Sequence, residues 1–207
     1  MRLIYGTTNP AKLDAMRRAL AGFPAEIIGL GELSDMPENA FDESGNNPLE
    51  NAVIKAKAYY NVLRQPVFSC DSGLYCDNLP DELQPGAHVR RAKGKTLSDE
   101  EMIAYYGGLA VRYGMLHARY RNAICLVMDE SHIYQSMAET LASMPFGIVE
   151  KPCPGHAKGF PLDSLSVRLT DGRYYLKLPS AERAQIIPYD GFSDFLRFAL
   201  ATSGTVR

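Results

Sequence analysis

The feature that most constrains the fold is the passage from an apolar run at residues 3–5 into a polar turn that begins at Gly6. The apolar run predicts a buried strand. Asn9 followed by Pro10 predicts a helix that begins there and reaches about residue 21, because asparagine caps helix N-termini and proline suits the first helical position. A strand, a turn and a helix N-terminus together present unpaired N–H groups to an anion. With Lys12 in the first helical turn, the stretch predicts a phosphate-binding turn in an α/β protein.

The same stretch allows a simpler interpretation, in which Asn9 and Pro10 only start a helix and Lys12 is a solvated surface residue. It is not a Walker loop, because the glycine spacing and the terminal Gly-Lys-Ser/Thr of that motif are missing. The choice between the two interpretations depends on the motifs that follow along the chain.

Composition limits the classes of function. A chain of 207 residues with 46% apolar and 22% charged residues is expected to fold as one globular domain, or as one domain with a smaller lobe. The net charge of -2 argues against a general binder of nucleic-acid polymers or membrane surfaces, but a single nucleotide needs only local positive charge. We expect no targeting segment and no membrane span. The four cysteines form no C-x-x-C pair, so the expectation is a cytoplasmic protein with reduced thiols.

Two further stretches carry candidate chemistry. An acid-rich loop at 32–47 precedes a second asparagine-proline helix start, and the helix over about 49–63 places Glu50 in its first turn and Lys55 one turn after Asn51. A buried strand at 67–70 then leads into Asp71, which is followed by Ser-Gly. An acid at the carboxyl end of an apolar strand is a common catalytic or metal-binding position in α/β proteins, although an Asx-turn ending the strand would look the same.

The second half of the chain predicts mainly strands. Alternating residues over 117–129 predict a strand that pairs with a partner at 133–143, and shorter strands are expected at 146–149 and 165–169. Helices are expected over about 99–106 and 191–200, and the segment 78–95 is irregular with a basic cluster. Since strands first alternate with helices and then pair with one another, a mixed α/β sheet fits best.

Three motifs together make the pattern recognisable. The sequences G-T-T-N-P-A-K at 6–12, S-G-N-N-P-L-E-N-A-V-I-K-A at 44–56 and C-D-S-G-L at 70–74 resemble, in order and distance, the T-G-N-x-x-K, G-x-T-F-x-E-N-A-x-x-K-A and A-D-D-S-G-L motifs of the inosine triphosphate pyrophosphatase family. Weaker matches follow at Pro85-Gly86 with Arg91, at Gly147-Ile148, and at Phe160 with Asp163. The chain thus resembles a divergent member of this family over nearly its whole length.

The resemblance implies a fold and an activity. It implies hydrolysis of a non-canonical purine nucleoside triphosphate to the monophosphate and pyrophosphate, with Mg²⁺ as cofactor. It also implies a single domain over residues 1–207, built as an elongated, twisted mixed β-sheet flanked by helices, in two lobes with a central cleft for the nucleotide. Members of the family are commonly homodimers, so a homodimer is expected.

Roles follow from position in the family motifs. The resemblance implies that Asp71 is the metal-linked catalytic base, that Glu50 is a second catalytic carboxylate, and that Asp42 or Glu43 is the other metal carboxylate. The substrate-binding residues that it implies are Thr7, Thr8, Asn9, Lys12, Lys55, Ser72, Arg91, Phe160, Asp163 and Arg183.

The residue types suit this chemistry. Hydrolysis at the α-phosphorus needs the triphosphate charge neutralised, which Mg²⁺, Lys12 and Lys55 can do together. It also needs a water aimed at phosphorus, which a carboxylate such as Asp71 or Glu50 can orient or deprotonate. Mg²⁺ takes oxygen ligands, so the cysteines and histidines are not ligand candidates in this interpretation.

The chain departs from the family at two places. Cys70 stands where the family has the first aspartate of A-D-D-S-G-L, so one carboxylate is missing. In the base pocket, F-G-Y-D becomes F-P-L-D at 160–163, and S-H-R becomes Ala181-Glu182-Arg183. Arg183 can still donate to a 6-oxo purine and Phe160 can stack on a base, so inosine or xanthosine triphosphate is the leading expectation. Glu182 could instead accept a proton from a base N–H or amino group.

The sequence allows two other interpretations. Because Cys70 removes a carboxylate, the chain could be a nucleotide-binding homologue with weak or no catalysis, and turnover with Mg²⁺ separates the two cases. An unrelated α/β phosphatase would need a nucleophile, and Cys70 lacks the phosphate-cradling loop that should follow it.

Overall fold

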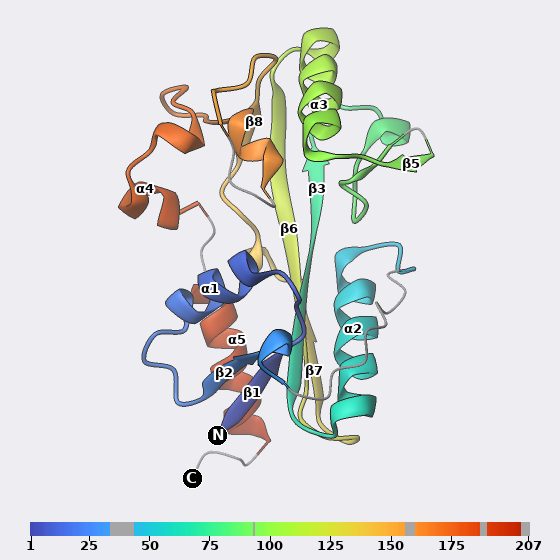
Figure 1. Cartoon of the computed structure of the whole chain (residues 1–207), viewed down its shortest axis with the longest axis vertical. Helices are drawn as coiled ribbons and strands as arrows, with labels where there is room; N and C mark the ends of the chain where they lie inside the picture. Colours follow the sequence, from blue (N-terminus) through green and yellow to red (C-terminus); the bar gives the residue numbers. More distant parts are fainter. Residues whose placement is uncertain (34–43, 93, 156–159, 187–189, 204–207) are drawn as a thin grey trace. The chain divides into compact units, whose positions relative to one another are not determined.

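The computed structural model describes residues 1–33, 44–92, 94–155, 160–186 and 190–203 (Figure 1). Its strands are β1 (Arg2–Tyr5), β2 (Glu26–Gly29), β3 (Val67–Cys76), β4 (Arg91–Ala92), β5 (Lys95–Thr96), β6 (Leu116–Val127), β7 (Ile133–Ser136), β8 (Phe146–Ile148) and β9 (Ser166–Arg168). Its α-helices are α1 (Pro10–Ala19), α2 (Pro48–Leu63), α3 (Asp99–Tyr113), α4 (Ser180–Ala184) and α5 (Asp190–Thr202). Short 3₁₀ turns are η1 (Leu30–Glu32), η2 (Asp81–Leu83), η3 (Glu139–Leu141), η4 (Pro161–Ser164) and η5 (Tyr175–Lys177).

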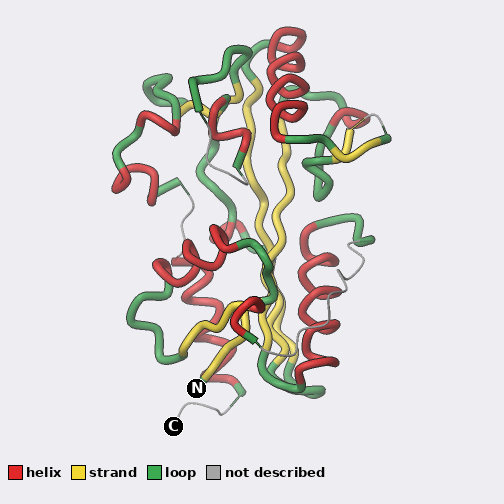
Figure 2. Tube along the Cα trace, viewed as in Figure 1, coloured by secondary structure: helices red, strands yellow, loops and turns green. Residues whose placement is uncertain are grey.

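The main sheet is mixed, which confirms the predicted α/β class. Its strands follow the order β2-β1-β3-β6-β8-β9, with β7 paired to β6 off this path. The pairs β1–β2 and β1–β3 are parallel, whereas β6–β7, β6–β8 and β8–β9 are antiparallel. The parallel pairs come from the first part of the chain, where helices separate the strands (Figure 2). The antiparallel pairs come from the second part, as the sequence predicted.

The chain divides into two compact units. Unit 1 comprises Met1–Ser72, Asn122–Leu141 and Tyr189–Arg207, and unit 2 comprises Gly73–Arg121 and Ala142–Pro188. The long strands β3 and β6 each contribute one part to either unit. Within the described residues, no helix is both apolar and long enough to cross a membrane.

In unit 1, helix α2 covers the strands through its small residues. Ala52 and Ala56 form one buried cluster with Ala123 and Cys125 of β6, as expected for the predicted alanine stripe. One turn further along α2, Tyr59 packs against the neighbourhood of Gly6, where an added Cβ would lie 2.8 Å from the tyrosine ring. Gly6 is therefore required at the end of β1 by the packing of Tyr59, and not only by the approach of a ligand.

In unit 2, several aromatic rings pack within a core that is rich in leucine. The Phe146 ring lies between two tyrosines, with its centroid 5.6 Å from that of Tyr120 and 5.7 Å from that of Tyr175. Helix α3 adds the buried residues Met102 and Tyr106 to the same cluster. This core includes Leu162 of η4, and η4 carries the predicted site residue Asp163 and directly follows Phe160.

Three predicted boundaries were wrong. The strand expected at 67–70 continues to Cys76, so Asp71 lies within β3 and not at its carboxyl end. The helix expected to end near 106 runs to Tyr113, because Gly107 and Gly108 are tolerated inside it; an added Cβ at Gly107 would lie 2.9 Å from Glu150 O. The expected partner strand at 133–143 ends at Ser136, and η3 follows it.

Candidate active site

Asp71 is held at both carboxylate oxygens by side chains of helix α2. Lys55 Nζ lies 2.9 Å from Asp71 Oδ1, and Asn51 Nδ2 donates to Asp71 Oδ2 at 3.1 Å. The Asp71 and Lys55 side chains are each only 11% exposed. The structure thus brings together Asp71 and Lys55, two residues that the sequence singled out, and adds Asn51, which it did not.

The local sequence explains why α2 presents these groups. Asn47 caps the helix by accepting from the Glu50 backbone N–H at 3.0 Å, and Pro48 occupies the first turn. Asn51 and Lys55 are four residues apart and therefore lie on one face of the helix. That spacing was the signal in the sequence that could have identified Asn51.

The turn between β1 and α1 has the predicted form. Asn9 Oδ1 accepts from the backbone N–H of Ala11 at 2.9 Å and of Lys12 at 3.4 Å, so this side chain caps the helix. Thr7 Oγ1 in turn accepts from the Asn9 N–H at 3.2 Å. The Thr8 side chain is exposed, and no described residue forms an ion pair with the half-buried Lys12 ammonium. The turn leaves Thr8 and Lys12 as its polar side chains available to an anion.

Cys70 and Asp71 point to opposite faces of β3, because they are neighbours in a strand. Burial raises the pKa of the Cys70 thiol to about 12, although a hydrogen bond with Tyr5 and the positive charges of Lys12 and Lys55 oppose this rise. The thiol is therefore neutral at pH 7 and replaces a carboxylate with an uncharged group.

The remaining carboxylates predicted for the site divide into two cases. The exposed carboxylate of Glu50 accepts from the Asn46 backbone N–H at 2.8 Å and from Asn47 Nδ2 at 2.7 Å, so it closes the N-terminus of its own helix. Asp42 and Glu43 lie outside the described residues. Among the residues that are described, no group of three or more His, Cys, Asp or Glu side chains could hold a metal ion.

A magnesium ion nevertheless fits the donor chemistry of Asp71. A carboxylate has about four lone-pair positions, and the contacts with Asn51 and Lys55 use two of those on Asp71. Mg²⁺ commonly binds through one or two protein carboxylates, with substrate phosphates and waters completing its shell. Asp71 therefore suits the role of one such carboxylate.

In unit 2, Asp163 is a buried carboxyl group that feels the charge of Arg183. Asp163 belongs to η4, and burial raises the pKa of its carboxyl group to about 6, an effect that the Arg183 charge partly opposes. Burial raises the pKa of Tyr120 and of Tyr175, and the negative charge of Asp163 adds to both rises. The rings of both tyrosines pack against the ring of Phe146. Sequence motifs gave no sign of this relationship, because both tyrosines are far from Asp163 in sequence.

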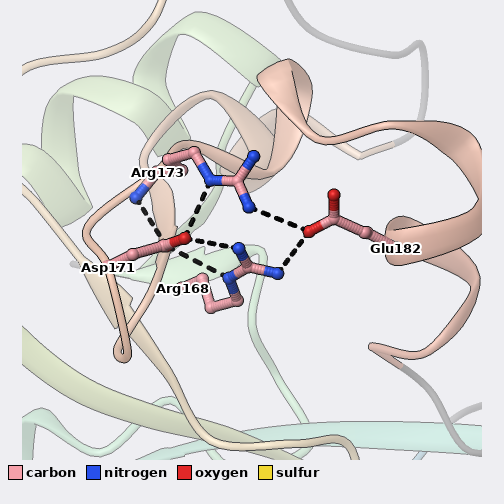
Figure 3. Close-up of polar contacts among 4 residues, drawn as sticks. All are labelled: Arg168, Asp171, Arg173 and Glu182. Carbon is pink, nitrogen blue, oxygen red and sulfur yellow. Dashed lines mark hydrogen bonds and ion pairs between the residues drawn. The ribbon is translucent and has the colours of Figure 1, made fainter.

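Glu182 is engaged by arginines. Its Oε2 accepts from Arg168 Nη1 at 2.5 Å and from Arg173 Nη2 at 3.0 Å (Figure 3). Both arginines also donate to the Asp171 carboxylate. The hydrogen bond with Arg168, followed by that with Arg173, holds the pKa of this carboxyl group well below its usual range. Glu182 therefore ties α4, the helix that carries Arg183, to the turn after β9. This position gives no support to a role of Glu182 in reading a base.

For the other predicted substrate-binding residues, the structure gives the element and the burial of each. Ser72 is half-buried on β3, and Phe160 is half-buried immediately before η4. Arg91 is exposed on β4, in the small two-stranded sheet that β4 forms with β5. Their roles in binding a nucleotide remain predictions.

Known proteins that are similar to this chain belong to the kind of family that its motifs indicated. The model of the Ham1 family matches residues 3–186. A dITP/XTP pyrophosphatase of Rhodopseudomonas palustris is 30% identical over 194 residues, covering 90% of this chain and 86% of that protein. One of Symbiobacterium thermophilum is 32% identical over 187 residues, covering 88% and 86% respectively.

Solved structures show the same fold. The HAM1 protein of Coxiella burnetii superposes with a TM-score of 0.76 at 22% identity, covering 98% of this chain and 99% of that one. The Ham1 protein of Staphylococcus aureus gives 0.75 at 20% identity, covering 98% and 100%. The family model, the two sequence relatives and the motifs at 6–12, 44–56 and 70–74 agree, and the chain belongs to the Ham1 family.

Proposed function

We propose that this protein is a Mg²⁺-dependent nucleoside triphosphate pyrophosphatase, with a non-canonical purine nucleotide as substrate. Water attacks the α-phosphorus, the bond to the β-phosphate oxygen breaks, and the products are the nucleoside monophosphate and pyrophosphate. The observation that carries this proposal is the buried arrangement of Asp71 between Asn51 and Lys55. The two relatives named dITP/XTP pyrophosphatase support the same class of reaction.

In this proposal, Asp71 orients the attacking water and accepts its proton, and Lys55 holds the carboxylate in place. An ammonium has three donors, so Lys55 can contact Asp71 and a phosphate oxygen at the same time. Lys12 and the N-terminus of α1 add positive charge for the remaining phosphates. When bound at Asp71, together with Asp42 or Glu43, Mg²⁺ would supply charge neutralisation and polarise the phosphoryl oxygens.

The base is assigned to unit 2. Phe160 would stack on it, and Arg183 would donate to a 6-oxo group, which favours inosine or xanthosine triphosphate over adenosine triphosphate. The charge of Arg183, which opposes the rise of the Asp163 pKa, supports a shared polar role for these two residues. Arg91 completes the proposed substrate contacts. We further propose a homodimer and a cytoplasmic location, as the family resemblance and the unpaired cysteines suggest.

A second candidate is a nucleotide-binding homologue with little catalysis. The neutral Cys70 thiol favours it, because this side chain brings no charge to the position where the family has an aspartate. The two candidates differ in turnover and not in binding.

The experiment is an assay of pyrophosphate release with the purified protein and Mg²⁺, using the triphosphates of inosine, xanthosine, guanosine and adenosine, with and without EDTA. The enzyme is expected to release pyrophosphate from inosine or xanthosine triphosphate, and EDTA should abolish release. Saturable nucleotide binding with no pyrophosphate from any substrate would favour the second candidate.

A further inference from the structure

Asn51 is a buried amide whose polar atoms both have partners. The residue is 1% exposed, its Oδ1 accepts from the Gly45 backbone N–H at 2.8 Å, and its Nδ2 donates to Asp71 Oδ2 at 3.1 Å. A buried amide is retained at a cost unless its hydrogen bonds are made. Here the bonds connect the segment before α2, the helix itself and strand β3.

Lys55 alone would not fix the direction of the Asp71 carboxylate. A single contact at Oδ1 leaves rotation about the Cβ–Cγ bond, for which carboxylates have a broad preference. The second contact, from Asn51 to Oδ2, restrains this rotation. The lone pairs that remain on the two carboxylate oxygens then have fixed directions.

The position of Asn51 is fixed by Gly45. An added Cβ at Gly45 would lie 2.5 Å from Asn51 Oδ1 and 2.9 Å from the Asn51 backbone nitrogen. Both distances are shorter than side chains tolerate, so glycine is required for this close approach. The amide is thus clamped on the side that faces away from Asp71.

We propose that Asn51 is a positioning residue, which sets the orientation of the Asp71 carboxylate for attack of water on the substrate. This inference deepens the proposed function and rests on it. Asn51 does not touch the substrate in this account. Its contribution passes through Asp71, so it should appear in kcat more than in KM.

The first test compares Asn51→Ala with a matched control, Asn122→Ala. Asn122 is also a buried asparagine of unit 1, 5% exposed, but its Nδ2 donates at 2.7 Å to Leu141 O and not to Asp71. A misplaced catalytic group can cost up to about 10²-fold, so Asn51→Ala is expected to lower kcat by roughly 10- to 100-fold with KM changed less than about threefold. Asn122→Ala should retain the wild-type kcat, and an equal loss of kcat in both variants would overturn the proposal.

The second test is a double-mutant cycle with Asp71→Asn. If Asn51 acts through Asp71, adding Asn51→Ala to Asp71→Asn should lower kcat by less than about threefold further. A full additional loss would mean that Asn51 acts independently of Asp71 and would overturn the proposal. If the alanine variant does not fold, Asn51→Ser replaces it, because a serine hydroxyl is too short to hold Gly45 and Asp71 together.

A third test measures structure and not turnover, so it can fail independently of the proposed function. Amide hydrogen exchange at Gly45 and the carboxyl ¹³C signal of Asp71 are measured by NMR in the wild type, Asn51→Ala and Asn122→Ala. We expect Gly45 to lose its protection and the Asp71 signal to shift only in Asn51→Ala. Unchanged signals in that variant would overturn the positioning role, whereas an absence of pyrophosphate release by the wild type would overturn only the proposed reaction.

Discussion

Lys55 Nζ and Asp71 Oδ1 form an ion pair of 2.9 Å in which each side chain is 11% exposed. Removing one partner of such a pair leaves the other as a buried charge without compensation. The pair therefore links the stability of unit 1 to the chemistry of the candidate site.

Replacing Lys55 should affect both properties. Lys55→Met leaves the Asp71 carboxylate buried without its ammonium, so unfolding in urea should show a loss of about 3–5 kcal/mol in the free energy of unfolding. Adding Asp71→Asn to the same chain removes the orphaned charge and keeps an acceptor for Asn51 Nδ2, so it should recover most of this loss, while pyrophosphate release stays low. A Lys55→Met variant as stable as the wild type would show that the pair is not buried in solution.

Lys12 should contribute to binding more than to turnover. In the proposed function its ammonium contacts phosphates both before and during the reaction, so Lys12→Ala is expected to raise KM about tenfold or more with little change in kcat. Arg18→Ala is the control, since Arg18 is an exposed cation on the same helix. Steady-state kinetics with the preferred triphosphate gives both constants, and a loss confined to kcat would contradict the assignment.

Arg183 should determine base selectivity. Without it, a 6-oxo group loses a charged donor worth about 1.5–3 kcal/mol, so Arg183→Ala should remove most of the preference for inosine over adenosine triphosphate. Glu182→Gln serves as the neighbouring control, because it weakens the contacts with Arg168 and Arg173 but keeps the Arg183 guanidinium. The preference is the ratio of kcat/KM for inosine triphosphate to kcat/KM for adenosine triphosphate. If this ratio is the same in the wild type and in Arg183→Ala, the base is read elsewhere.

Asp163 should make stability depend on pH. Burial raises the pKa of this carboxyl from 3.8 to about 6 in the folded protein, so the folded state binds its proton more strongly than the unfolded state does. The stabilisation is complete below pH 4 and is lost as pH rises through about 6. Asp163→Asn should therefore raise Tm above pH 6 and leave it unchanged near pH 3.5 in thermal unfolding by circular dichroism. A higher Tm for the variant at both pH values would remove titration as the cause.

The sequence predicted the local elements of unit 1 well because their signals are local. The asparagine-proline pairs at 9–10 and 47–48 mark the starts of α1 and α2, and the alanine stripe of α2 predicts its buried face. The motif order also predicted that Lys55 and Asp71 belong to one site. Nothing in the sequence, however, indicated that β3 would continue through Gly73 to Cys76, since glycine usually weakens a strand.

The contacts that depend on tertiary packing could not be predicted. The close approach of Gly45 to Asn51 and the packing of Tyr59 at Gly6 are visible only when α2 is placed against the strands. The engagement of Glu182 likewise requires β9 and α4 to be brought together. Sequence motifs identified residue types for the chemistry, and tertiary structure identified which neighbours hold them.

In the proposed reaction, Asp71 supports hydrolysis of a nucleoside triphosphate with Mg²⁺. The most direct measurement is pyrophosphate release from inosine triphosphate by the wild type and by Asp71→Asn, which keeps the shape of the side chain and removes its charge. We expect turnover by the wild type and a fall of about 10²-fold or more in the variant, with nucleotide binding retained. Pyrophosphate release by Asp71→Asn at the wild-type rate would contradict it.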